Sequence, residues 1–292
     1  MHGLVAKHVF IEYNNSIALE RTTFFMKYKL IASDMDGTLL NDDSVITERN
    51  KQAIIKAENA GVMFVTATGR PFTNTVVINE ILTKDVPFIV LNGAEVHMAK
   101  SNELLLERFL DYDLAIEAFA LGQELGIAQI VWTGPYLWAN RICDKTTGYE
   151  SRSSERIRSA ITDLATIKDK VKGVSKVLWI DDPERIEMLS VEMSAHFGER
   201  LTCASSMSHF LEFIGSNAGK GSALKEVGKL FGIDRSEIIA IGDNYNDVCM
   251  LEYAGFSVAV DNAVDGVKAV ADYVTVSNNN DAVAEVIERF VL

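Results

Sequence analysis

The sequence predicts an α/β protein, in which a doubly wound, Rossmann-like parallel-sheet core is interrupted by an inserted α+β domain. Short apolar runs alternate with helical stretches over the first hundred or so residues, which is typical of a parallel sheet with crossover helices. The same rhythm resumes at Lys220. Between these two parts lies a region of helices and paired strands. We therefore expect the core to be split in the sequence, with one half on each side of the insert.

The first half of the core begins with Lys29–Asp34, a short apolar run that ends in a carboxylate and predicts a buried strand. Thr47 can cap the following helix, in which alanine and isoleucine recur at helical spacing until Gly61. Val62–Thr68 and Pro87–Leu91 are the next apolar runs. They predict a second and a third strand of the parallel sheet.

The rest of the chain divides into the insert and the second half of the core. Before and within the insert, the pattern predicts strands at Glu95–Met98, Leu104–Phe109, Ile127–Trp132, Tyr136–Asn140 (after a turn at Gly134-Pro135), Val174–Ile180, Leu201–Ala204 and His209–Ile214, and a helix from Asp181-Asp-Pro183 to Phe197. For the second half of the core it predicts a helix from Lys220 to Phe231, strands at Glu237–Gly242, Ser257–Val260 and Tyr273–Val276, and helices at Val248–Ala254 and Asp281–Phe290.

These patterns give a division of the chain into an N-terminal extension (residues 1–25), a catalytic core (26–110 and 215–292) and an inserted cap domain (111–214). The extension lacks the continuous apolar core of a signal peptide, because Glu12, Asn14 and Asn15 interrupt it. Met26 then opens a stretch that leads directly into the first strand. We expect the extension to be dispensable for chemistry; a targeting or partner-binding arm is the alternative.

Composition excludes several classes of function. The 292 residues carry a formal charge of −13, whereas nucleic-acid partners require clustered lysine and arginine. No apolar run approaches the roughly 18–20 residues that span a bilayer. The three cysteines are scattered, without the spacing of a disulfide framework or a zinc site. We therefore expect a cytoplasmic protein without nucleic-acid or membrane partners.

The strongest chemical signal is Asp34-Met-Asp36-Gly37-Thr38-Leu39 at the end of the first strand. Catalytic groups of open α/β sheets lie beyond the carboxyl ends of the strands. Two carboxylates at this spacing can be directed into one pocket, where one attacks phosphorus and the other transfers protons. A bare Asp-x-Asp is usually an acidic loop with a helix cap. The following Gly-Thr at a strand end favours catalysis.

Three further motifs follow other predicted strands or precede a helix. In Thr66-Ala-Thr68-Gly69-Arg70, a hydroxyl and glycine amides can bind phosphate oxygens, although a plain strand-to-helix turn is equally compatible. In Asn217-Ala-Gly219-Lys220-Gly221, a lysine beside two glycines can approach an anion closely, whereas a lone lysine is usually a solvated surface residue. The third, from Ile239 to Asp247, delivers Asp243 and Asp247 onto one loop. Such hard oxygen ligands suit Mg²⁺, and a polar helix-capping turn is the alternative.

Taken together in chain order, these four motifs resemble the haloacid dehalogenase (HAD) superfamily of aspartyl phosphohydrolases. The size and position of the insert resemble the type IIB cap of the Cof-like sugar-phosphatase branch. Further details agree, namely Asn92-Gly93-Ala94, Gly219-Lys-Gly-Ser-Ala-Leu224 and Ala271-Asp-Tyr-Val-Thr275. One departure is Asn278-Asn-Asn-Asp281-Ala282, where relatives often carry a glycine after the acidic residue. The resemblance runs from Met26 to Leu292.

The resemblance implies a Mg²⁺-dependent phosphatase that acts on a small phosphorylated metabolite, such as a sugar phosphate or a phosphorylated cofactor. It assigns the following roles: Asp34 as nucleophile, Asp36 as general acid and base, Thr68, Gly69, Lys220 and Asn246 in phosphate or substrate binding, and Asp34, Asp36 (through its main-chain carbonyl) and Asp243 as metal ligands, with Asp247 as a further candidate. Mg²⁺ and Lys220 would supply the positive charge that an acidic protein needs to bind phosphate. An ordinary salt bridge is the favoured role for Arg70.

Four other functions compete with this interpretation. A dehalogenase of the same superfamily needs neither Asp36 nor a metal, and a transporting ATPase would need membrane spans. A phosphomutase with the same core and cap remains the main enzymatic alternative. From a different class, a sugar-phosphate-sensing binding protein would need no complete set of acids. For substrate selection the insert offers Trp132, Tyr136, Trp138 and His209, although aromatic side chains on such strands are more often core.

Overall fold

The computed structural model describes residues 27–134, 136–151 and 156–292. The predicted extension, residues 1–25, lies outside the described residues, and so does Pro135 of the predicted turn. Within the described ranges, no helix combines the length and the apolar composition that a bilayer crossing requires.

A five-stranded sheet in the order β14-β13-β12-β1-β2 forms the centre of residues 27–110 and 215–292, the catalytic half expected from the sequence. Its strands are β1 (Leu30–Ser33), β2 (Met63–Thr66), β12 (Ile238–Gly242), β13 (Phe256–Ala259) and β14 (Tyr273–Val274), and every neighbouring pair is parallel. Leu30 of β1 pairs with Ile238 of β12, so the segment before the insert and the segment after it meet inside one sheet. The strand order reverses between β1 and β12, which is where open α/β sheets bind ligands.

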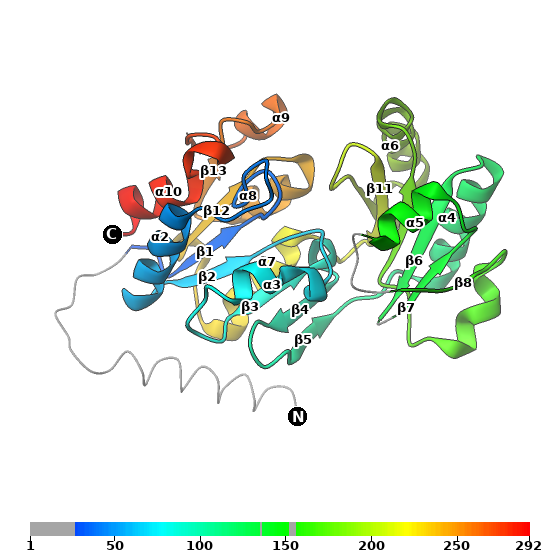
Figure 1. Ribbon diagram of the computed structural model, residues 1–292, viewed down its shortest axis with the longest axis horizontal. Coiled ribbons are helices and arrows are strands. Elements are labelled where there is room, and N and C mark those ends of the chain that lie inside the picture. The colour runs from blue at the N-terminus through cyan, green and yellow to red at the C-terminus, as the bar shows by residue number, and fades with distance from the viewer. Residues whose placement is uncertain (1–26, 135, 152–155) are drawn as a thin grey trace.

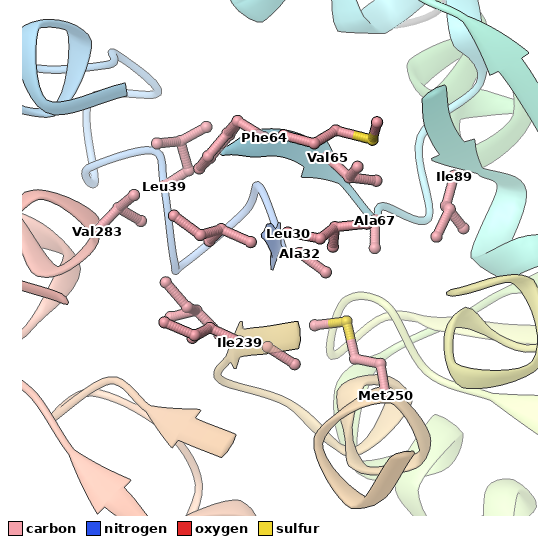
Figure 2. Close-up of a cluster of buried hydrophobic side chains, with 14 of the residues drawn as sticks. Leu30, Ala32, Leu39, Phe64, Val65, Ala67, Ile89, Ile239, Met250 and Val283 are labelled. Carbon is pink, nitrogen blue, oxygen red and sulfur yellow. The ribbon is translucent and has the colours of Figure 1, made fainter. Parts of the chain in front are cut away.

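Helices cover this sheet on both faces. They are α2 (Glu48–Asn59), α3 (Val76–Asn79), α7 (Lys220–Phe231), α8 (Val248–Tyr253), α9 (Asp265–Lys268) and α10 (Ala282–Phe290). Thr47 caps α2 by accepting a hydrogen bond from the Asn50 amide, as its sequence position predicts. Figure 2 shows Leu30 in the sheet, with Val283 of α10 on one side and Met250 of α8 on the other. Because β1 is buried on both faces, its apolar side chains do not alternate with polar ones. The predicted doubly wound fold is thus confirmed.

A small antiparallel sheet adjoins the parallel one. It contains β3 (Pro87–Val90), β4 (Glu95–Met98) and β5 (Leu104–Glu107) in that order. The strands predicted at Glu95–Met98 and Leu104–Phe109 are confirmed as the antiparallel pair β4 and β5. The strand predicted at Pro87–Leu91 is confirmed as β3, which contacts both sheets. It pairs along its length with antiparallel β4, and a parallel bridge between Ala67 and Ile89 joins it to the end of β2. A continuous apolar run fits a buried strand of either kind, so its sequence could not distinguish them.

The elements between β5 and α7 form a six-stranded sheet in the order β10-β11-β9-β6-β7-β8. Its strands are β6 (Ala128–Thr133), β7 (Tyr136–Ala139), β8 (Ile157–Ala160), β9 (Lys176–Ile180), β10 (Leu201–Ala204) and β11 (Phe210–Gly215), and its helices are α4 (Tyr112–Glu124), α5 (Asp144–Ser151) and α6 (Pro183–Phe197). In Figure 1 these elements form the green half of the molecule, beside the half that carries the parallel sheet.

The two faces of this second sheet pack against different parts of the protein. Trp179 and Phe213 belong to a buried cluster with residues of α4 and α6. Leu178 and Ile214, which alternate with them along the strands, belong to a cluster that includes Leu91 of the catalytic half. One face of the second sheet is therefore directed toward the catalytic half.

Candidate active site

Three neighbouring strands end at the same edge of the parallel sheet. Asp34 follows β1, and its amide donates to the Ile241 carbonyl of β12 at 2.9 Å. Asp243 follows β12, while Thr68 lies two residues beyond the end of β2. Because these strands are parallel neighbours, the motifs predicted from the sequence meet at their carboxyl ends.

Lys220 lies at the centre of the acidic groups. Its Nζ donates to Asp34 Oδ1 at 2.5 Å and to Asp247 Oδ1 at 2.6 Å, and its side chain is fully buried at the start of α7. Burial works against the charged ammonium, but the charges of Asp247 and Asp34 outweigh it and raise the pKa of Lys220. Lys220 is therefore a permanently charged group that holds two carboxylates in place.

Asp247 fixes the loop after β12. Its Oδ1 accepts from Lys220, while its Oδ2 accepts from the amides of Asp243 and Asn244 at 3.0 and 3.1 Å. The side chain is completely buried. With both oxygens engaged by the chain, Asp247 is arranged to position Lys220 and Asp243.

Asp34 and Asp243 experience an excess of negative charge. Burial raises the pKa of Asp34 well above its usual value; Lys220 opposes this increase, and Asp247 and Asp243 add to it. Burial and the charge of Asp247 raise the pKa of Asp243 to about 6, although Thr38 donates a hydrogen bond to Asp243 Oδ1 at 2.8 Å. Crowded carboxylates of this kind are stabilised by a cation.

Three of the acids are close enough to share an ion. Asp34, Asp243 and Asp247 each offer an oxygen, and these oxygens all lie within 4.8 Å of one another. Oxygen ligands in this arrangement fit a hard cation such as Mg²⁺. Gly37 makes room for the group: its φ is +82°, and a Cβ there would lie 2.6 Å from Asp243 Oδ2.

Asp36 and Arg70 form a bidentate ion pair. The Arg70 Nε donates to Asp36 Oδ2 at 2.8 Å and its Nη2 to Asp36 Oδ1 at 2.5 Å. About a third of each side chain is exposed. The Arg70 amide also donates to the Thr68 hydroxyl at 3.1 Å, which anchors the loop after β2. The salt bridge expected for Arg70 is confirmed, with Asp36 as its partner.

A cavity of about 200 Å³ opens above these groups, between the parallel sheet and the second sheet. It is lined by Asp34, Asp36, Gly69, Arg70, Pro71, Asn74, Tyr149, Lys176, Ser206, Met207, Phe210, Glu212, Asp243, Asn244 and Asn246. Among the site residues expected from the sequence, Thr68, Lys220 and Asp247 do not line the cavity and are buried. The other expected residues line it directly.

The second sheet contributes residues that the sequence analysis missed. Lys176 and Glu212 line the cavity, while the suggested selectors Trp132, Tyr136, Trp138 and His209 do not. Trp132 and Trp138 are buried in the packing of the second sheet. A charged residue inside an otherwise apolar strand was the available signal for Glu212, in Phe210-Leu-Glu212-Phe213-Ile.

An acid-rich cavity at the switch point of a doubly wound sheet is typical of an α/β enzyme that acts on a small ligand. Comparison with known proteins identifies its family. The chain belongs to the haloacid dehalogenase-like hydrolases, which it matches over residues 31–287. The resemblance to the HAD superfamily and its Cof-like type IIB branch is thereby confirmed, and the protein is a phosphatase.

Three relatives illustrate the similarity. The chain is 35% identical to YxeH of Bacillus subtilis, whose name provisionally calls it a phosphatase, over 91% of this chain and 99% of YxeH. It is 33% identical to the 5-amino-6-(5-phospho-D-ribitylamino)uracil phosphatase YcsE of Bacillus subtilis, over 90% of this chain and 96% of YcsE. The crystal structure of a haloacid dehalogenase-like hydrolase from Bacteroides thetaiotaomicron superimposes with a TM-score of 0.76 at 30% identity, covering 90% of this chain and 99% of that one.

Proposed function

We propose that the protein is a Mg²⁺-dependent phosphatase that hydrolyses small phosphate monoesters, through a phosphorylated intermediate on Asp34. The observation that carries this proposal is the placement of Asp34 at the cavity, with Lys220 bound to its Oδ1 at 2.5 Å. Asp36 lines the same cavity two residues further along the chain. A nucleophile and a proton carrier thus line one cavity, and a buried positive charge contacts the nucleophile.

The residues present fit a divalent cation. The carboxylates of Asp34 and Asp243 would hold it, together with the main-chain carbonyl of Asp36, while Asp247 positions Lys220 and the loop. When bound, Mg²⁺ would offset the repulsion between Asp34 and the phosphate dianion, about 4 kcal/mol per charge pair at 4 Å and an effective dielectric near 20.

In the proposed reaction, Asp34 forms a bond to phosphorus while the bond to the leaving oxygen breaks. Lys220 and the Thr68 hydroxyl stabilise the phosphoryl oxygens, with the amide of Gly69 nearby, and Asn246 contacts the substrate. Asp36 gives a proton to the leaving oxygen and then takes one from the water that hydrolyses the aspartyl-phosphate. The bidentate contact with Arg70 occupies both carboxylate oxygens of Asp36. We therefore infer that Asp36 separates from Arg70 when it transfers protons.

We further propose that residues 111–214 act as the cap domain and that the catalytic core comprises residues 26–110 and 215–292. The cavity between the two sheets supports this division, because each contributes part of its lining. The relative YcsE is named for a phosphorylated ribityl compound, so polyol phosphates and phosphorylated cofactors are the substrates to test first. Cys143, Cys203 and Cys249 are free thiols, which supports a reducing, cytoplasmic setting.

The test is phosphate release from a panel of sugar phosphates, flavin mononucleotide, pyridoxal phosphate and 4-nitrophenyl phosphate, with Mg²⁺ and without any bisphosphate activator. Rapid acid quenching after incubation with a ³²P-labelled substrate should trap label on the wild-type protein and none on Asp34→Asn. Isomerised substrate that appears without free phosphate would identify a phosphomutase. Binding without turnover of any compound would identify a sensing protein and overturn the proposal.

A further inference from the structure

Two charged side chains are buried on the face of the second sheet that is directed toward the catalytic half. Lys176 lies at the start of β9 and Glu212 in the middle of β11, with exposed fractions of 1% and 2%. Leu178 and Ile214, which share that face, are apolar. Both charged side chains nevertheless line the cavity above Asp34. This position exposes them to a bound ligand while it shields them from bulk water.

Glu212 is held by three side chains. Its Oε1 accepts from Lys176 Nζ and from the Ser206 hydroxyl, each at 2.9 Å, and its Oε2 accepts from the Asn92 amide. Asn92 in turn accepts a hydrogen bond from Asn246 Nδ2 at 3.0 Å. A continuous polar chain therefore runs from the catalytic loop after β12 to the second sheet.

The backbone around Asn92 is adapted to this contact. Leu91 and Asn92 have φ values of +48° and +54°, a left-handed conformation that is unfavourable for leucine. A Cβ on the next residue, Gly93, would lie 2.2 Å from the Gly219 carbonyl oxygen just before α7. The chain thus adopts a strained turn that places the Asn92 amide between Asn246 and Glu212.

Stability does not explain why this pair is buried. Replacing a buried ion pair with apolar residues of similar size is often neutral or stabilising, because desolvation offsets the attraction between the charges. The apolar neighbours of Lys176 and Glu212 show that this face packs well without charge. A ligand that enters the cavity is the group that would use their hydrogen-bonding capacity.

We propose that Lys176 and Glu212 form the subsite that binds the hydroxyl groups of the leaving alcohol, and hence select polyol and sugar monophosphates. This inference rests on the proposed phosphatase function. An ammonium donates to a hydroxyl oxygen and a carboxylate accepts from a hydroxyl proton, so the pair matches two hydroxyls on neighbouring carbons. Because the two charges cancel, the subsite favours a neutral polyol over a second phosphate. Tyr149, Met207 and Phe210 supply apolar lining for the carbon skeleton.

The experiment measures kcat and KM for Glu212→Gln, Lys176→Met and the double variant Lys176→Met/Glu212→Leu. The substrates are ribitol 5-phosphate, ribose 5-phosphate and glucose 6-phosphate, compared with 4-nitrophenyl phosphate, whose leaving group has no further hydroxyl. On the best polyol or sugar phosphate, kcat/KM should fall about 10- to 100-fold, mainly through KM, as expected when a hydrogen bond to a charged group is lost. Activity on the aryl phosphate should be retained.

Asp181→Asn is the matched control. Asp181, which directly follows β9, is also a buried acid that is paired with a lysine, Lys145, but it does not line the cavity. It should leave the ratio of polyol to aryl activity unchanged. Thermal unfolding of each variant shows whether it folds. If the lysine variants do not fold, Glu212→Gln, which preserves the shape of the side chain, still tests the inference.

Equal losses on both kinds of substrate would show that the pair merely holds the two sheets together, which overturns the inference. Unchanged kcat/KM on the polyol and sugar phosphates would also overturn it. So would a wild-type enzyme that hydrolyses only the aryl phosphate, although the proposed phosphatase function would then stand. A wild-type enzyme that hydrolyses neither kind of substrate would instead contradict the proposed function itself.

Discussion

Replacing Lys220 by methionine tests whether the buried charges of the site are as interdependent as their contacts indicate. The substitution keeps the length of the side chain and removes the ammonium that contacts Asp34 at 2.5 Å and Asp247 at 2.6 Å. Removing one partner of a buried ion pair typically destabilises a protein by about 3–5 kcal/mol. Because overall stabilities are about 5–15 kcal/mol, we expect a large but measurable loss.

The size of the loss should depend on pH. In the variant, a carboxyl group can escape its unpaired charge by binding a proton. From a reference pKa near 3.9, this costs about 4 kcal/mol at pH 7 and about 1.5 kcal/mol at pH 5. The folded variant would then bind a proton that the unfolded chain has lost, so its stability falls as the pH rises. The wild-type protein also gains some stability in this range, because the pKa values of Asp34 and Asp243 are already raised in it. The deficit relative to wild type should therefore shrink between pH 7 and pH 5 by a part of the about 2–3 kcal/mol that one newly bound proton supplies.

Urea unfolding at the two pH values, with excess chelator to remove metal, measures this deficit. Lys229→Met is the control, because Lys229 forms an exposed ion pair with Glu226. It should change the free energy of unfolding by less than about 1 kcal/mol. A deficit for Lys220→Met below 1 kcal/mol, or an equal deficit at both pH values, would refute the reasoning about the buried charges.

Three further predictions concern the reaction, the metal site and the extension. Asp34→Asn should abolish turnover on every substrate. The defect of Asp36→Asn should be smaller on 4-nitrophenyl phosphate than on a sugar phosphate, because general acid–base help of about 10²–10⁴-fold matters less for a good leaving group. Steady-state rates at saturating Mg²⁺ measure this, and equal losses of Asp36→Asn on both substrates would contradict the assigned roles. Gly37→Ala should weaken Mg²⁺ binding in titration calorimetry, because its Cβ would lie 2.6 Å from Asp243 Oδ2 in a left-handed backbone. Gly148→Ala is the control, because a Cβ there would meet no atom from other parts of the chain within 4 Å. Unchanged affinity of Gly37→Ala would count against the proposed ligand set. Deleting residues 1–25 should leave kcat/KM nearly unchanged, and a large decrease in a folded truncated protein would assign the extension a role in catalysis.

The catalytic edge could be predicted because its residues follow strands that are recognisable one at a time. Asp34 and Asp243 each end a short apolar run, and parallel pairing of β1 with β12 places them side by side. Lys220 could be predicted as part of the site, but its burial could not, because that depends on two carboxylates that reach it from different loops. The local sequence was therefore enough to predict which edge of the sheet carries the site. The network of charges around Lys220 depends on contacts between distant segments and could be seen only in the folded structure.

The part of the cavity that belongs to the second sheet was harder to predict. Strands β6, β9 and β11 are buried on both faces, so apolar residues do not alternate along them and the face directed toward the catalytic half is not apparent. Trp132 and Trp138 were predicted as candidates for substrate selection, but the structure shows both in the packing of the second sheet. Lys176 is held at the cavity by contacts with Gly69 and Glu212, which are far away in the sequence.

The distribution of charge leads to the last prediction. The basic side chains of the site already have acidic partners: Arg70 and Lys176, which line the cavity, bind Asp36 and Glu212, and the buried Lys220 binds Asp34. Asp243 accepts a hydrogen bond from Thr38 and forms no ion pair with a basic side chain in the part of the chain that the structure describes. A phosphate dianion would therefore add to a negative charge that the protein itself does not neutralise.

We therefore expect the reaction to require an external cation, and not merely to become modestly faster when one is present. Hydrolysis should stop in excess chelator and return when Mg²⁺ is added beyond the chelator, with phosphate release as the measurement. Asp243→Asn provides a matched comparison, since it removes one negative charge and keeps the shape of the side chain. It should need a higher Mg²⁺ concentration for half-maximal activity, because the amide oxygen that remains is an uncharged and therefore weaker ligand. Full activity of the wild-type enzyme in chelator would show that Lys220 and Arg70 neutralise the phosphate without a metal.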